Sequence, residues 1–275
     1  MRLDSEGDGI RLGIAEVWRY RDLVRLLTKK TFTLAYQQTV LGPLWIILNP
    51  VLSSLIYMFI FGHIAAIGTG GVPQVLFYFL SAAVWELFAA SLTANSNTFV
   101  VNAYLFSKVY FPRLAVPISN MFVSLLKFGI QFLIIVALMI VFLIRGAVGP
   151  MWAYFPLLPF LFIQMSMLGM SVGILISSLT TKYRDLLMVV SVGVNLWMYA
   201  SPIVYPMSSL PDGVLKILIK INPVTEIVEL IRWILIGHGE FEIVYYLCSL
   251  GVTLALFACS AAIFNRVERT FADRI

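Results

Sequence analysis

The sequence predicts an all-α membrane protein with six transmembrane helices, an N-terminal amphipathic interface helix and two short re-entrant helices before the last span. Hydrophobic residues make up 60% of the 275 residues and charged residues only 12%, too few to cover a soluble globular protein. The charges also cluster, leaving long uncharged runs such as 31–85, 146–181 and 243–265. Because a charge near the bilayer centre costs roughly 3 kcal/mol or more, charged residues are expected at the ends of spans.

The uncharged runs accommodate six helices of the roughly 20 residues that a bilayer requires. We predict spans at about 44–62, 76–101, 115–144, 152–178, 186–205 and 243–264. The first run is too long for one helix, and the glycine- and proline-containing segment 68–73 interrupts it. The chain therefore divides into an N-terminal segment (1–43), a transmembrane domain (44–265) and a short tail (266–275).

The distribution of lysine and arginine predicts that both termini are cytoplasmic. With the N-terminus inside, 14 of the 19 basic residues lie on the cytoplasmic side and four outside, while Lys127 falls within the third span. Basic loops are retained in the cytoplasm, so this orientation is favoured over its reverse.

Residues 14–34 differ from the spans in having one apolar and one charged face. Val17, Val24 and Leu27 recur at helical spacing with Tyr20 and Leu34, while Arg19, Asp22, Arg25 and Lys29 occupy the other face. The pattern predicts an amphipathic helix in the cytoplasmic interface. An ordinary solvated helix is the alternative, against which Trp18 and the basic face argue.

The segment 212–237 predicts two half-helices that enter the membrane from the outer side. Each piece is apolar but too short or too charged to cross it. Asn222 suits a helix N-cap and Pro223 the first helical position. Glu229 and Arg232 are three residues apart and can pair on one helix.

No motif for chemistry within this chain is present. The sequence lacks a Gly-rich phosphate-binding loop ending in Gly-Lys-Ser or Gly-Lys-Thr, so any ATP must be bound by another polypeptide. We expect no metal site and no catalytic residue: His63 and His238 stand alone, and Cys248 and Cys259 have no metal-binding or disulfide spacing. Glu86 and Lys127 are in different predicted spans, where an ion pair or a lining role explains them without catalysis.

Several segments, in order along the chain, resemble the ABC-2 type permeases that export O-antigen, capsule and teichoic acid polymers. These segments are Gly42-Pro43-Leu44-Trp45 with Asn49-Pro50, Lys108-Val109-Tyr110-Phe111-Pro112-Arg113, Tyr183-Arg184-Asp185, Ser201-Pro202-Ile203-Val204-Tyr205-Pro206 and Asn222-Pro223. The resemblance extends over about residues 16–265.

The resemblance implies a permease that works as a homodimer with two separate ATPase subunits, which hold ATP and Mg, so this chain itself binds no cofactor. The loop Lys108, Val109, Tyr110, Phe111, Pro112, Arg113 is similar to the family's ATPase-coupling helix, in which Tyr110 and Phe111 would be anchors. An aromatic belt at the interface is the alternative for this loop. A second cytoplasmic contact would involve Lys182, Tyr183, Arg184 and Asp185.

The implied substrate is a lipid-linked polysaccharide, exported across a bacterial inner membrane. Arg21, Arg25, Lys29 and Lys30 are placed to meet its anionic head group, although ordinary anionic lipid would attract the same residues. Aromatic side chains could line the path as stacking surfaces for sugars, with packing or lipid contact as the alternative. The candidates are Trp85, Phe88, Tyr104, Phe106, Trp197 and Tyr199. Asn222, Pro223, Glu226, Glu229 and Arg232 would form an outer gate.

Three other functions are compatible with the sequence. The first is an ABC-2 exporter of a small hydrophobic drug or lipid. The second is a secondary transporter driven by an ion gradient, although no repeat is evident and Glu86 is the only acidic candidate within the spans. The third is a membrane protein with a structural or assembly role. Nothing in the sequence suggests a nucleic-acid partner; the expected partners are a second copy, the ATPase, the substrate and membrane lipid.

Overall fold

The computed structural model describes residues 14–37, 39–102, 111–180 and 185–272, and these residues form helices and connecting turns without a β-strand. The all-α prediction is therefore confirmed. Five helical segments of the described chain are long and apolar enough to cross a membrane. They are Gly42–Ile64, Gln74–Ser96, Ala115–Ile144, Trp152–Thr180 and Ile243–Phe264.

The first segment combines a 3-10 turn (η1, Gly42–Leu44), α3 (Trp45–Tyr57) and a π-helical turn (η2, Met58–Ile64). The second is α4 (Gln74–Ser96), and the predicted continuation to 101 is a separate turn of helix, α5 (Thr98–Val101). The third, α7 (Ala115–Ile144), has the predicted bounds. The fourth is η3 (Trp152–Leu157) with α8 (Leu158–Thr180), and the fifth belongs to α12 (Ile243–Ala272).

The predicted span 186–205 is shorter than expected. Its helix, α9 (Leu186–Tyr199), has 14 residues and so a length of about 21 Å, less than the roughly 30 Å of a hydrocarbon core. Residues 200–205 are turns, because Pro202 lacks the N–H that a continuing helix would use. The six-span count is therefore not confirmed in the described part of the chain.

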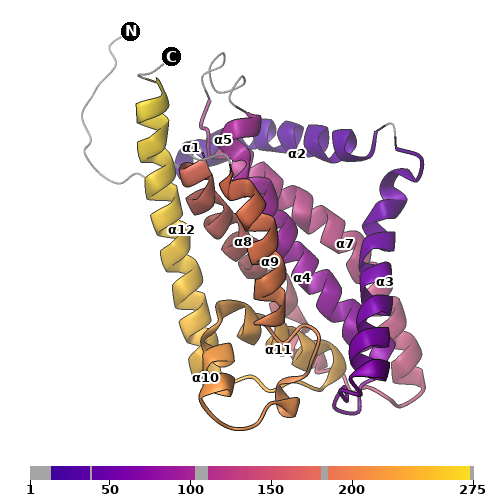
Figure 1. Ribbon diagram of the computed structural model, residues 1–275. Helices are drawn as coiled ribbons and strands as arrows, with labels where there is room; N and C mark the ends of the chain where they lie inside the picture. Colours follow the sequence, from indigo (N-terminus) through magenta and orange to yellow (C-terminus); the bar gives the residue numbers. More distant parts are fainter. Residues whose placement is uncertain (1–13, 38, 103–110, 181–184, 273–275) are drawn as a thin grey trace.

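The helices run between two ends of the molecule (Figure 1). At one end, here called the α2 end, α1 (Ile14–Arg19) and α2 (Arg21–Tyr36) lie across the bundle, close to α5 and to the last turns of α12. At the opposite end, the α11 end, lie η4 (Met207–Ser209), α10 (Val214–Ile221) and α11 (Pro223–Ile236).

The centre of the bundle is the contact between α4 and α8. A Cβ added to Gly169 would lie 2.5 Å from the Phe88 carbonyl oxygen, and one added to Gly173 would lie 2.4 Å from that of Leu92. The Ser91 hydroxyl donates to the Ser166 carbonyl at 2.7 Å. Small residues let the two backbones come close together, so that a serine hydroxyl of one helix can reach a backbone carbonyl of the other, as is usual for packed transmembrane helices.

The apolar face of α2 packs on the protein rather than standing free. Val17 and Val24 are buried in a cluster with Phe111, Leu114 and other residues. Tyr20 and Leu34, predicted on the same face, are exposed, and Trp18 is 72% exposed. The predicted helix 14–34 is therefore divided at Tyr20 into α1 and α2, and only part of its predicted apolar face packs against the bundle.

Candidate functional site

The α11 end contains the segment 212–237, for which two half-helices were predicted, and α11 begins where the sequence predicted. The Asn222 Oδ1 atom accepts a hydrogen bond from the Val224 backbone N–H at 3.1 Å, and Pro223 occupies the first turn. At the other end of the helix Gly237 has a φ of +80°, the left-handed conformation that closes many helices. The predicted N-cap is confirmed.

The Asn222 side chain also joins the two half-helices to the end of α9. Its Oδ1 atom accepts from the Trp197 indole N–H at 3.1 Å, while its Nδ2 donates to the Ser201 hydroxyl at 2.9 Å and the Ala200 carbonyl at 3.2 Å. One amide thereby binds two side chains and one backbone carbonyl at the end of α9. A predicted channel aromatic and a predicted gate residue are in direct contact.

Arg232 is buried inside the protein, with 2% of its surface exposed. Its Nη1 donates to Glu229 Oε1 at 2.6 Å, which confirms the predicted pairing. Its Nη2 donates to the Ser81 hydroxyl of α4 at 2.6 Å and to the Ile203 carbonyl at 3.3 Å, and the guanidinium lies 4.2 Å from the centre of the Phe77 ring. These contacts fix α11 against α4 and the segment after α9.

The two glutamates of α11 anchor the extended segment that leads into α12. Glu229 Oε2 accepts from the Glu240 backbone N–H at 3.0 Å, and Glu226 Oε2 accepts from the Glu242 backbone N–H at 3.1 Å. Glu226 was predicted only as an outer-gate residue, and its hydrogen bond joins α11 to the segment just before α12. Glu226 is fully buried, and burial raises its pKa to about 7.

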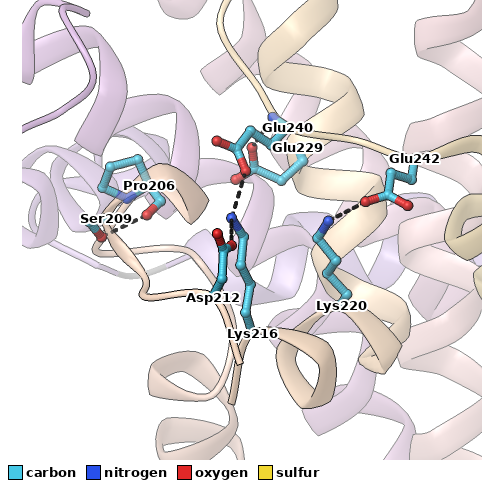
Figure 2. A network of polar contacts seen from close by, with 8 residues as sticks. All are labelled: Pro206, Ser209, Asp212, Lys216, Lys220, Glu229, Glu240 and Glu242. Carbon is cyan, nitrogen blue, oxygen red and sulfur yellow. Dashed lines mark hydrogen bonds and ion pairs between the residues drawn. The ribbon is translucent and has the colours of Figure 1, made fainter. Parts of the chain in front are cut away.

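Two lysines of α10 complete the network from the other side (Figure 2). Lys216 Nζ lies 3.1 Å from Asp212 Oδ1 and 3.3 Å from Glu240 Oε2. Lys220 pairs with the carboxylate of Glu242. The neighbouring carboxylates raise the pKa of Lys216, so this lysine stays charged.

The sequence interpretation missed these lysine contacts. Lys216 and Lys220 are four apart on a helix, whereas Glu240 and Glu242 are two apart on an extended segment, so both pairs project from one side of their elements. That matched spacing was the available signal. It does not reveal that the two elements are neighbours.

Two cavities flank the network. One, of about 460 Å³, lies between α10 and the end of α9 and is lined by Trp197, Tyr199, Ala200, Tyr205, Leu210, Leu215, Leu218, Ile219 and Asn222. The other, of about 320 Å³, is more polar, and Glu229, Arg232, His238 and Glu240 are among its lining residues.

The predicted channel aromatics separate into different environments. Trp85 and Phe88 are buried, and Phe88 packs against Trp197 with ring centres 5.0 Å apart. Tyr199 is 51% exposed and lines the larger cavity with Trp197. Tyr104 and Phe106 lie outside the described residues. Within one chain, Trp197 and Tyr199 are thus the described candidates that reach a cavity.

The predicted coupling residues fall partly outside the described chain. Lys108, Val109 and Tyr110, and likewise Lys182, Tyr183 and Arg184, lie outside it. Of the rest, Phe111 is buried against Leu114, while Asp185 is exposed at the start of α9. The helices that flank both loops end at the α2 end (Figure 1).

The basic residues predicted to meet a lipid head group, Arg21, Arg25, Lys29 and Lys30, are exposed on α2. Lys127 of α7 lies close to this helix, with its Nζ 5.5 Å from the centre of the Tyr36 ring. In the described chain, no three histidine, cysteine or acidic residues are grouped as a metal ion would need.

Comparison with known proteins identifies similar chains of nearly the same length. Two Klebsiella pneumoniae proteins named O-antigen export system permease protein RfbA are 29% and 30% identical over 254 residues, which is 92% of this chain and 94% of each relative. A Myxococcus xanthus protein of the same name is 25% identical over 267 residues, 97% of this chain and all of the relative. A family model described as ABC-2 type transporter matches residues 22–236. The chain therefore belongs to the ABC-2 type transporter family.

Proposed function

We propose that this chain is the permease subunit of an ABC transporter that exports lipid-linked, O-antigen-like polysaccharide across a bacterial inner membrane. The observation that carries the proposal is the alignment of 92–97% of the chain with permeases named for O-antigen export. Five helices long and apolar enough to span a membrane support a transport role. The permease works as a homodimer with two copies of a separate ATPase, which binds ATP and Mg²⁺.

The α2 end is the cytoplasmic side in this proposal, with both termini in the cytoplasm. The positive-inside distribution supports that orientation, since Arg21, Arg25, Lys29 and Lys30 are exposed there and can bind a phosphate-containing head group. In the same orientation, the predicted coupling loop lies on the cytoplasmic side. Phe111, packed against Leu114, anchors the base of the loop in the bundle, and the 108–110 segment contacts the ATPase.

The second copy packs against α3 and α9. Both helices expose large apolar side chains along their length, for example Ile56 at 54%, Val192 at 59% and Leu196 at 64%. The α9 face also exposes Ser191 and Asn195, so it is not purely lipid-like. A homodimer would bring the aromatic residues near Tyr199 from two chains around one path, where stacking favours a sliding sugar chain.

The test is reconstitution of the permease with its ATPase in proteoliposomes. ATP should drive translocation of lipid-linked polysaccharide, and a hydrolysis-deficient ATPase should abolish it. Transport of a small apolar drug but not of the polymer, or transport driven by a proton gradient without ATP, would contradict the proposal.

The coupling loop is tested by co-purification. A Tyr110→Ala variant should lose most of the bound ATPase while staying folded in the membrane. Tyr154→Ala, at a 50% exposed tyrosine beside α8, is the matched control and should keep the ATPase bound. Equal binding by both variants would place the ATPase contact elsewhere.

A further inference from the structure

The helix α10 has its polar face turned toward the protein and its apolar face turned outward. The side chains of Lys216 and Lys220 are only 18% and 13% exposed, whereas Val214, Leu218 and Ile221 are 74%, 61% and 61% exposed. A helix on a water-facing surface has the opposite arrangement. Its lysines therefore serve contacts inside the molecule.

The two half-helices are held very differently. Nearly all of α11 is buried, and Arg232 and Asn222 tie it to α4 and α9. In α10 the one buried residue is Ile219, and its two lysines pair with the segment before α12. We call the Lys216–Glu240 and Lys220–Glu242 pairs the lysine latch. Because α10 buries a single residue, few apolar contacts hold it against the rest of the protein. The lysine latch therefore contributes much of the interaction that keeps α10 in place.

The ends of α10 permit movement about a defined point. Gly213 precedes the helix, and nothing lies within 4 Å of the position that a Cβ would take there; Asn222 follows the helix in an extended conformation. The Asn222 side chain is fixed by the Trp197 indole and by Ser201. A displacement of α10 would therefore pivot at Asn222 and leave α11 unchanged.

The cavity of about 460 Å³ lies between α10 and the end of α9 and is open at the surface, since Tyr199, Leu215 and Leu218 in its lining are exposed. Leu215, Leu218 and Ile219 form its α10 wall, and Trp197, Tyr199 and Tyr205 lie on the opposite wall. Movement of α10 away from the body would widen this aromatic cavity and uncover Ile219, the buried residue of its α10 wall.

We propose that α10 is a hinged lid, that the lysine latch holds it against the aromatic cavity, and that breaking the latch widens the cavity and uncovers Ile219. The proposal rests on the proposed function, in which the α11 end is the outer side of the permease; α10 is the moving part there and α11 the fixed part. Both ion pairs are partly solvent-accessible, with Glu240 and Glu242 side chains 45% and 55% exposed, so they can break and re-form at modest cost.

The experiment measures the accessibility of Ile219, which lines the cavity from the lid. An Ile219→Cys reporter is introduced into the full-length permease with Cys248→Ser and Cys259→Ser, because both native cysteines are exposed. The permease is reconstituted with its ATPase, and labelling by a membrane-impermeant maleimide is timed. Lys216→Gln with Lys220→Gln should accelerate labelling roughly fivefold to tenfold, as the loss of two exposed ion pairs allows.

The charge-reversed pair Lys220→Glu with Glu242→Lys is the matched control and should restore slow labelling relative to Lys220→Glu alone. High salt should also accelerate labelling of the unmodified latch, because it screens exposed pairs. A labelling rate unchanged by the glutamine substitutions, or one that charge reversal fails to restore, would overturn the latch.

A second measurement does not depend on the Ile219 reporter. Lys220→Cys and Glu242→Cys, joined by a reducible thiol crosslinker, should stop polysaccharide export, and dithiothreitol should restore it. Full export with the crosslink in place would overturn the lid. If the transporter moves no polysaccharide in any variant while labelling still follows the latch, the proposed function fails and the lid stands.

Discussion

The Arg232 guanidinium of α11 donates to the Ser81 hydroxyl of α4 at 2.6 Å, across 151 positions of sequence. The same guanidinium pairs with the buried Glu229 carboxylate. The contact therefore connects the α11 end to the centre of the bundle.

Replacing Arg232 by Met should destabilise the protein strongly, because Glu229 is left as an unpaired buried charge. Loss of one partner of a buried pair typically costs about 3 to 5 kcal/mol. Thermal unfolding of the purified permease would measure the loss. The double variant Arg232→Met with Glu229→Met should be less destabilised than the single one. Arg145→Met, at an arginine near the Phe142 ring, is the control and should change stability little.

A Cβ at Gly173 should disrupt the α4–α8 contact. The added carbon would lie 2.4 Å from the Leu92 carbonyl oxygen, which is backbone and cannot move without shifting α4. We expect Gly173→Ala to cost about 1 to 3 kcal/mol, measured by thermal unfolding in detergent. Gly129→Ala on α7, where nothing lies within 4 Å of the added carbon, should be neutral or slightly stabilising. If Gly173→Ala is as stable as Gly129→Ala, α4 and α8 can move apart to accommodate the added methyl group at little cost, which would contradict the prediction.

Substitutions at Asn222 should distinguish its two roles. Asn222→Ala removes the N-cap and should cost about 1 kcal/mol or more. Asn222→Asp retains an acceptor for Val224 and Trp197 but loses the donors to Ser201 and Ala200. If the link to α9 controls α10, the Asp variant should keep most of the stability yet show faster labelling at Ile219→Cys. If the Asp variant is labelled at Ile219→Cys no faster than the protein with Asn222, then Asn222 serves only as a helix cap.

Glu226 should make stability depend on pH. It lies on α11, outside the five candidate spans, and its pKa of about 7 exceeds the ordinary value of 4.5 because of burial. The folded protein thus binds the proton more tightly than the unfolded chain, and this contribution is complete below pH 4.5 and lost as pH rises through about 7. We expect a decline of about 2 kcal/mol in the free energy of unfolding between pH 5 and 8.

Glu226→Gln should abolish that decline, since its side chain does not titrate. Asp185→Asn, at an exposed carboxylate, should keep it. Thermal unfolding across the pH range would compare the three proteins. A wild-type decline that persists in Glu226→Gln would assign the titration to another group.

Local patterns in the sequence were sufficient for several elements. The uncharged run 114–126 with 128–144 predicted α7, because charge and apolar length directly limit which residues can enter a bilayer. Asn222-Pro223 predicted the start of α11, and the three-residue spacing predicted the pair of Glu229 and Arg232. Each of these features depends on residues within one or two helical turns.

Contacts between distant segments were decided by the tertiary structure. Phe88 was predicted to line a channel, but it is buried against Trp197, because the neighbouring helices cover that face of α4. The predicted span at 186–205 ends at Tyr199, where Asn222, more than 20 residues away, binds the exposed carbonyl of Ala200.

The sequence by itself determined that this chain is an apolar helical membrane protein and that its segment 212–237 is too short or too charged to form a further span. Only the tertiary structure decided that Lys216 and Lys220 face Glu240 and Glu242 and that Arg232 reaches Ser81. Hydropathy and helical periodicity are local properties, whereas an ion pair between two elements requires that folding bring their charges within a few ångströms.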